Sequence, residues 1–176
     1  MKKISLVIFL SVFLFSSPVR AEAYAFYVDD SCSDDRDGSE SKPFCDIADA
    51  LEKAGNGDKI YIKDGIYEEN VKLPKGVSLR GKSESGVVIS GYVEMDDESS
   101  LENLTVSGSS INIRIKKDAD VEIDDCTIKE AKQVGIQTEI GGGKLKVKNS
   151  KIRDGGKGLY IQSGKNIEMT GNEIYD

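Results

Sequence analysis

The chain has 176 residues, with 24 Lys and Arg against 31 Asp and Glu, and it contains no His and no Trp. The length suits a single domain, and the net charge of −7 argues against nucleic acid and anionic membranes as partners. The absence of His excludes His-dependent catalysis and His-ligated metal sites.

Residues 1–21 have the composition of a secretory signal peptide. Lys2 and Lys3 give a positive start, residues 4–15 form an apolar core too short to span a membrane, and Val19 and Ala21 occupy the positions that define a cleavage site. We therefore expect export, a mature chain that begins near Glu22, and no membrane contact after cleavage. The expected destination is extracellular or the cell surface, with the periplasm, or retention of this segment as a membrane anchor, as alternatives.

Residues 22–58 are expected to form an N-terminal strand, a loop and a capping helix. Residues 25–28 alternate as a strand does, and residues 29–42 are a polar loop rich in Asp, Ser and Gly. Pro43 and Gly55 bracket a predicted helix over residues 44–54. Its apolar face consists of Phe44, Ile47, Ala48, Leu51 and Ala54. We expect this face to cover the open end of the core that follows.

Residues 59–176 carry an internal repeat with a period of 22–24 residues. Strand-like blocks recur, and their first apolar positions are Leu79, Leu101, Ile123, Val147 and Met169. Their last apolar positions are Val106, Ile128, Ile152 and Ile174, and a further strand repeats as Ile113, Ile136 and Leu159. Repeats of this length with several short strands predict an all-β solenoid of stacked coils. A leucine-rich repeat has a similar length, but no coil shows the helical half that it needs.

Stacking of the coils places each inward residue on its equivalent in the next coil, about 4.8 Å away. A turn column, whose residues tolerate a left-handed backbone and can bond the neighbouring coil, consists of Gly81, Asn103, Asp125, Asn149 and Gly171. In the first coil we expect strands at 59–63 and 71–73, with turns at 65–69 and 74–76. The repeat reaches Asp176 without a capping segment, so we expect further β-helix coils or a separate cap to cover this end.

The three cysteines are expected to have two different roles. Cys32 and Cys45 close a short loop, and in an exported protein a disulfide between them would contribute roughly 3 kcal/mol. Cys126 falls in an inward column between Leu104 and Ser150, where we expect a free, buried and unreactive thiol.

Segments on either side of the predicted helix resemble a known family. The residues FYVDD, DGSESKPF and GDKIYIKDGIYEENV are similar to the N-terminal region of secreted, pectate-lyase-like right-handed parallel β-helix proteins. The resemblance covers nearly all of the mature chain, and it implies a right-handed β-helix with three sheets. It also implies that the turns at Asn103, Asp125 and Asn149 join the second and third strands of each coil. The column that contains Ile113 then lies on the first sheet, which in enzymes of the group forms a polysaccharide groove.

The outward positions of that first sheet give the candidate binding residues. They form two columns, Arg114, Gln137 and Tyr160, and Lys116, Glu139 and Gln162. A sugar chain could stack on the tyrosine ring and bond the amides, and either cation could pair with a uronate carboxylate. The resemblance implies an Arg or Lys proton abstractor with calcium in the lyases, which makes Arg114 a candidate catalytic base. A solvated face of mixed charge is the competing interpretation.

The sequence offers two candidate calcium positions and no complete catalytic motif. Asp34, Asp35 and Asp37 before a glycine loosely resemble a calcium loop, although Asp and Gly are also ordinary turn residues. In the groove itself the sequence indicates only Glu139 as a carboxylate. The motifs of Arg-Pro-Arg lyases and the aspartate motif of pectin esterases are absent, and residues 65–69 match the esterase G-x-Y-x-E segment only approximately.

Three functions remain open from the sequence. The first is an extracellular module that binds, or also processes, acidic polysaccharide. The second is a structural or adhesive surface β-helix without enzyme activity. The third is a fragment of a calcium-dependent polysaccharide lyase.

Overall fold

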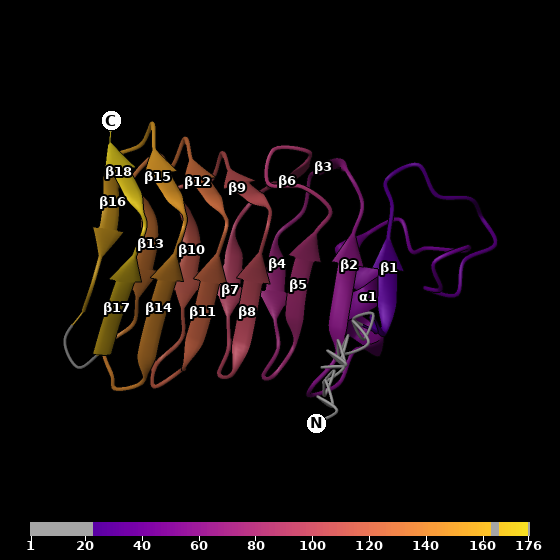
Figure 1. Ribbon diagram of the computed structural model, residues 1–176, viewed down its shortest axis with the longest axis horizontal. Helices are drawn as coiled ribbons and strands as arrows, with labels where there is room; N and C mark the ends of the chain where they lie inside the picture. Colours follow the sequence, from indigo (N-terminus) through magenta and orange to yellow (C-terminus); the bar gives the residue numbers. More distant parts are fainter. Residues whose placement is uncertain (1–22, 163–165, 176) are drawn as a thin grey trace, which may run out of the picture.

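The computed structural model describes residues 23–162 and 166–175, and the expected signal peptide over residues 1–21 lies outside these ranges. Within them the chain winds into a parallel β-solenoid, with α1 (Ile47–Lys53) at its N-terminal end (Figure 1). None of the described residues belongs to a helix long and apolar enough to cross a membrane.

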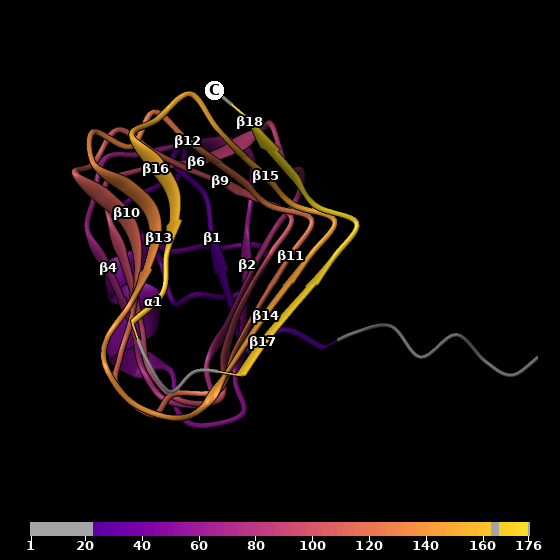
Figure 2. The same cartoon turned by 90° about the vertical axis from the view of Figure 1, so that its left-hand side faces the viewer.

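Three parallel sheets run along the axis of the described part and enclose the core (Figure 2). Sheet I contains β4 (Val71–Leu73), β7 (Val93–Met95), β10 (Ile111–Ile115), β13 (Val134–Thr138) and β16 (Lys157–Tyr160). Sheet II contains β1 (Phe26–Val28), β2 (Lys59–Ile62), β5 (Ser78–Gly81), β8 (Ser99–Glu102), β11 (Val121–Asp124), β14 (Lys144–Lys148) and β17 (Asn166–Thr170). Sheet III contains β3 (Gly65–Tyr67), β6 (Val87–Ser90), β9 (Thr105–Ser107), β12 (Thr127–Lys129), β15 (Lys151–Arg153) and β18 (Glu173–Tyr175).

The predicted apolar columns are confirmed by the register of the strands. Leu101 pairs with Ile123, Ile123 with Val147, and the same file continues to Leu79 and Met169. The other two predicted files also pair in register. Their members are buried except in the last coil, where Leu159 is partly buried and Ile174 is 52% exposed. Leu101, Ile123 and Val147 are fully buried. Each such side chain contributes about 1.5–3 kcal/mol by leaving water, so the repeat itself accounts for the core.

The turn between sheets II and III differs from the prediction at one position. Asn103, Asp125 and Asn149 have positive φ values of 57°, 49° and 46°, as expected. Gly81 instead lies within β5 and is not among the residues with positive φ, because residues 82–86 form a longer connection before β6. A Cβ atom on Gly81 would lie 2.2 Å from the carbonyl oxygen of Asn103, so close packing of the next coil explains this glycine.

Two elements near the N-terminus also differ from their predicted limits. Helix α1 begins at Ile47 and not at residue 44, because Phe44 is paired with Val28 in an isolated parallel bridge. Of the predicted helix face, Ala48 is exposed, and Ala50 is buried in its place. Residues 65–69, expected as a turn, begin with strand β3, whose partner is β6. Strand β1 pairs with β2, so sheet II continues into the segment 22–58.

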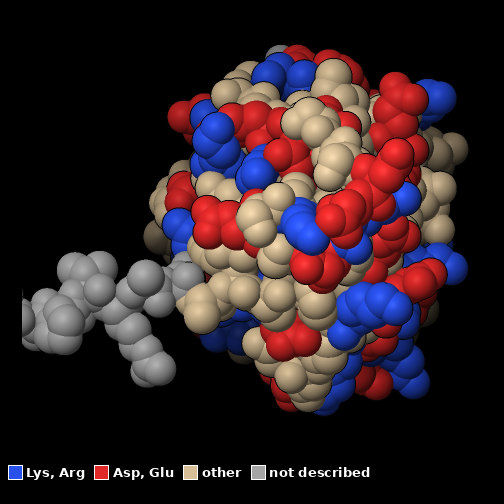
Figure 3. Space-filling model, turned by 90° about the vertical axis from the view of Figure 1, so that its right-hand side faces the viewer, with Lys and Arg blue, Asp and Glu red and all other residues tan. Residues whose placement is uncertain are grey.

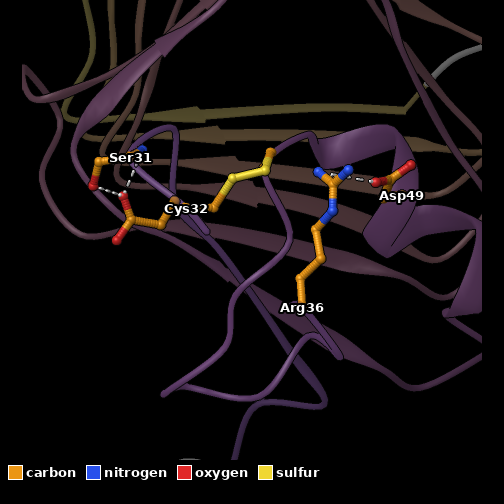
Figure 4. Close-up of a disulfide and its surroundings, with 6 residues drawn as sticks. Ser31, Cys32, Arg36 and Asp49 are labelled. Carbon is orange, nitrogen blue, oxygen red and sulfur yellow. Dashed lines mark hydrogen bonds and ion pairs between the residues drawn. A yellow bond between two sulfur atoms is a disulfide. The ribbon is translucent and has the colours of Figure 1, made fainter. Parts of the chain in front are cut away.

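A disulfide between Cys32 and Cys45, as expected, joins the N-terminal loop to the segment that precedes α1 (Figure 4). The Arg36 guanidinium lies 3.9 Å from the Asp49 carboxylate on α1 in the same view. Figure 3 shows acidic and basic side chains interspersed on the N-terminal end of the molecule. This end is therefore held by covalent and ionic contacts as well as by the helix.

Candidate functional site

The predicted binding residues form one continuous patch on the outward face of sheet I. Arg114 pairs in register with Gln137, and Gln137 pairs with Tyr160. Lys116 and Glu139 lie just past the ends of β10 and β13, where their backbone N–H groups donate to Met95 and Ile115. The parallel register therefore places the two predicted columns side by side along the solenoid axis.

The structure adds two carboxylates that the spacing of the sequence did not indicate. Glu94 pairs in register with Arg114 and with Lys72, and its carboxylate lies 3.9 Å from the Arg114 guanidinium and 4.0 Å from the Lys116 ammonium. Asp96 lies 2.8 Å from the Lys116 ammonium. The step from Glu94 to Arg114 is 20 residues, whereas the next step, from Arg114 to Gln137, is 23 residues. Because this coil is shorter, a constant step of 23 did not predict either carboxylate.

The charges of the patch stabilise one another. The hydrogen bond from Lys116 lowers the pKa of the Asp96 carboxyl below its ordinary value, and the same bond raises the pKa of Lys116. The side chains of Arg114 and Lys116 are 43% and 42% exposed, whereas Glu94 is 20% exposed. Both cations are thus accessible to a ligand, while the carboxylate beneath them is partly covered.

The C-terminal half of the patch is polar and aromatic. The Tyr160 ring is exposed, and the Lys157 ammonium lies 5.3 Å from its centroid. The Gln162 backbone N–H donates to the buried Thr138 hydroxyl, and the Glu139 carboxylate accepts a hydrogen bond from the Lys117 N–H. The first contact fixes the backbone at Gln162, and the second holds the Glu139 side chain against the backbone of Lys117.

Two of the three aspartates in the predicted calcium loop have partners within the protein. Asp35 forms an ion pair with Lys42, and the Asp37 carboxylate accepts a hydrogen bond from the Ser39 N–H. Hydrogen bonds from Ser39 lower the pKa of Asp37. In the described ranges no group of three or more His, Cys, Asp or Glu side chains is placed to hold a metal ion, and this includes Asp34 and its neighbours. Calcium binding therefore rests on the sequence alone.

Comparison with known proteins identifies the fold of this chain. The family described as "Right handed beta helix region" matches residues 45–176. The uncharacterized protein YwoF of Bacillus subtilis (strain 168) is 29% identical over 138 residues, which span 72% of this chain and 28% of YwoF.

Two solved structures are similar in fold. Pectin methylesterase PemA from Erwinia chrysanthemi matches with a TM-score of 0.57 and 19% identity, over 74% of this chain and 55% of that one. A pectin methylesterase in complex with a hexasaccharide matches with a TM-score of 0.54 and 18% identity, over the same shares of the two chains. At these identities the likeness concerns the fold alone.

Proposed function

The chain belongs to the right-handed β-helix family, and from that premise we propose that it is an extracellular module whose sheet I binds acidic polysaccharide. One observation carries this proposal: the strand register assembles Arg114, Gln137 and Tyr160 into a single outward file. We expect export from the predicted signal peptide. The net charge of −7 repels any polyanion, so the attraction to an acidic glycan must come from the local cations Arg114 and Lys116.

The shape of the face suits a polymer. Successive strands repeat about every 4.8 Å, so a sugar chain lying along the axis would meet a new pair of outward side chains at every coil. An open face of this kind presents many weak contacts in a row and leaves both ends of the polymer free. This arrangement favours an extended glycan over a small enclosed ligand.

The chemistry of the patch suits a uronate-containing chain. The Arg114 guanidinium can make paired hydrogen bonds to a carboxylate, and Lys116 can act as a second point charge. Tyr160 offers a ring face for a sugar, and the Gln137 and Gln162 amides can donate to and accept from hydroxyl groups. Glu94 and Asp96 hold the two cations in place, and the side chains of Arg114 and Lys116 stay 43% and 42% exposed.

The similar solved structures support this choice of ligand. Both are pectin methylesterases, and one of them was solved in complex with a hexasaccharide. Because this chain shares only the fold with them, we extend to it the class of ligand and not the reaction.

Binding assays on single-site variants test the proposal. The protein is titrated with oligogalacturonate and with a neutral oligosaccharide of the same length. We expect Arg114→Ala and Tyr160→Ala each to weaken binding of oligogalacturonate about tenfold, which corresponds to ~1.4 kcal/mol. Lys146→Ala on sheet II is the matched control and should leave binding unchanged. If both patch variants bind as the unchanged protein does, sheet I is not the site, and the structural or adhesive function is favoured.

The same samples decide whether the module also processes its ligand. With calcium and polygalacturonate present, a lyase would release an unsaturated product that absorbs in the ultraviolet. Signal that depends on Arg114 would assign it the role of proton abstractor, whereas binding without signal would restrict the function to recognition.

A further inference from the structure

The outward file of sheet I continues beyond the residues that the proposed function uses. Glu94, which pairs in register with Arg114, also pairs in register with Lys72 on β4. The file therefore runs over all five strands of the sheet, from Tyr160 to Lys72. Four strand spacings of about 4.8 Å give it a length of roughly 19 Å. A glycan that lies on this face reaches Lys72 if it is long enough to continue past Arg114.

The charge of Lys72 is not balanced by a carboxylate of the protein. Lys72 is exposed and forms no ion pair with any residue in the described ranges. The carboxylate of Glu94, its partner in register, instead lies 3.9 Å from the Arg114 guanidinium and 4.0 Å from the Lys116 ammonium. Arg114 and Lys116 thus share the carboxylates of the patch, whereas the Lys72 ammonium is available to an anionic group of a ligand.

Lys72 lines a hollow of about 370 Å³ between β4 and helix α1. Asn70, Lys72 and Pro74 alternate with the buried Val71 and Leu73, so they form the floor of the hollow on the outward face. Helix α1 packs against β4 from its N-terminal side (Figure 1). The helix supplies the wall of the hollow, which consists of Ala48, Leu51 and Glu52. The volume lies within the range of small-ligand pockets, about 300–1,000 Å³.

The lining of the hollow combines apolar surface with separate donors and acceptors. Leu51 and Pro74 are half-buried and offer carbon atoms against which a sugar ring can pack. The Asn70 amide oxygen accepts a hydrogen bond of 3.1 Å from a backbone N–H of the next coil, which orients the amide and leaves its nitrogen to donate. Glu52 and Lys72 form no ion pair with each other, so Glu52 can accept from hydroxyl groups while Lys72 binds a carboxylate. This combination fits a uronate sugar, which has a ring, hydroxyl groups and a carboxylate.

We propose that Lys72 and this hollow form a further uronate subsite of the face on sheet I, and that the ligand is an acidic oligosaccharide long enough to extend from Tyr160 to helix α1. This inference rests on the proposed function, because the rest of the face must hold the chain that reaches the hollow. In an extended chain a pyranose residue advances by about one strand spacing. A trisaccharide therefore covers Arg114, Gln137 and Tyr160 alone, whereas a hexasaccharide also reaches Lys72.

Calorimetric titrations with trigalacturonate and hexagalacturonate test the subsite. In the unchanged protein we expect the hexamer to bind about tenfold more tightly than the trimer. Lys72→Met should leave the affinity for the trimer unchanged and reduce this ratio to about twofold, since a longer chain then gains only more ways to lie on the face. Lys72→Arg keeps the charge and should retain the full ratio. Lys53→Met removes a charge from α1 outside the hollow and is the matched control, which should behave as the unchanged protein does.

The two ligand lengths separate this inference from the proposed function. If the trimer binds through Arg114 and the hexamer binds no more tightly, sheet I is a glycan site and the subsite at Lys72 is refuted. A tenfold ratio that persists in Lys72→Met, or that Lys53→Met lowers equally, also refutes the subsite. An equal ratio for maltotriose and maltohexaose would show that Lys72 does not recognise a carboxylate. Absence of binding of both galacturonates removes the proposed function together with the subsite, and circular dichroism confirms that each variant is folded.

Discussion

The carboxylate of Glu69, in the first coil, accepts a hydrogen bond of 2.8 Å from the backbone N–H of Ile47 at the start of helix α1. Its second oxygen accepts a hydrogen bond of 3.0 Å from the Ala48 N–H. The helix has no cap from its own N-cap residue, Asp46, so a side chain 22 residues away performs this role. The capping helix is therefore attached to the solenoid by a charged acceptor as well as by its buried face.

Removal of this acceptor should loosen the N-terminal cap. Glu69→Ala leaves the Ile47 and Ala48 N–H groups without their partner at a half-buried position, and we expect the free energy of unfolding to fall by about 1–2 kcal/mol. Urea unfolding followed by circular dichroism measures the change. Glu68→Ala, at the exposed neighbouring position, is the control and should cost less than about 0.5 kcal/mol. Equal effects of the two variants would contradict the capping role.

The same carboxylate should make stability depend on pH. Burial raises the pKa of Glu69 above its ordinary value, and the N–H donors only partly oppose this. The folded protein then holds the proton more tightly than the unfolded chain. The stability that the Glu69 carboxyl contributes through this proton is fully present below about pH 4.3. It is lost as the pH rises through the pKa of Glu69 in the folded protein. Relative to Glu69→Gln, the unchanged protein should lose stability as the pH rises above about 4.3, and a difference that stays constant with pH would refute this.

The turn at Asn103 should tolerate glycine better than alanine. Its side-chain amide donates to the carbonyl oxygens of Gly81 and Lys82, each at 3.0 Å, and its φ is 57°. Asn103→Ala loses both bonds and replaces asparagine by a residue that tolerates the left-handed region less well, at a cost of about 2–3 kcal/mol. Asn103→Gly loses the bonds alone and should recover about 1 kcal/mol of that. Thermal unfolding of the two variants separates the cost of the lost hydrogen bonds from the cost of the left-handed backbone. Equal losses of stability in both variants would show that the backbone conformation carries no cost.

The disulfide should support the N-terminal loop. Cys32 and Cys45 are 13 residues apart, and a bridge that closes a loop of this length contributes roughly 3 kcal/mol. Cys32→Ser/Cys45→Ser should lower the free energy of unfolding by about that amount, as measured in urea. Addition of a reductant to the unchanged protein should have the same effect, and should not affect the double variant.

The thiol of the third cysteine should not react with alkylating agents in the native protein. Cys126 is fully buried and free, and burial raises the pKa of its thiol to about 12. Iodoacetamide at pH 8 should therefore leave it unmodified until the protein is unfolded, since the thiolate is the reactive form. Mass spectrometry before and after unfolding measures this. Rapid alkylation of the native protein would show that the column between Leu104 and Ser150 opens readily.

Sequence spacing predicted only part of the patch on sheet I. Arg114, Gln137 and Tyr160 could be placed on one face from their constant step of 23, and the register confirms that placement. Glu94 and Asp96 could not, because the preceding coil is shorter and a fixed step misses its strand. Gly81 was misplaced for the opposite reason, since a longer connection follows it.

The sequence by itself determined the solenoid, its inward columns, the disulfide and the buried Cys126. A period close to 22 residues with apolar positions in fixed phase leaves one way to bury them, which is to stack each on its equivalent. Only the tertiary structure decided the contacts that join different coils outside this period. Glu69 reaches the helix, and Glu84 reaches Lys151, because loops and caps bring together residues whose separation along the chain has no periodic relation. The period of the sequence determines which residues stack in the inward columns. Only the folded chain determines which loop and cap residues contact them.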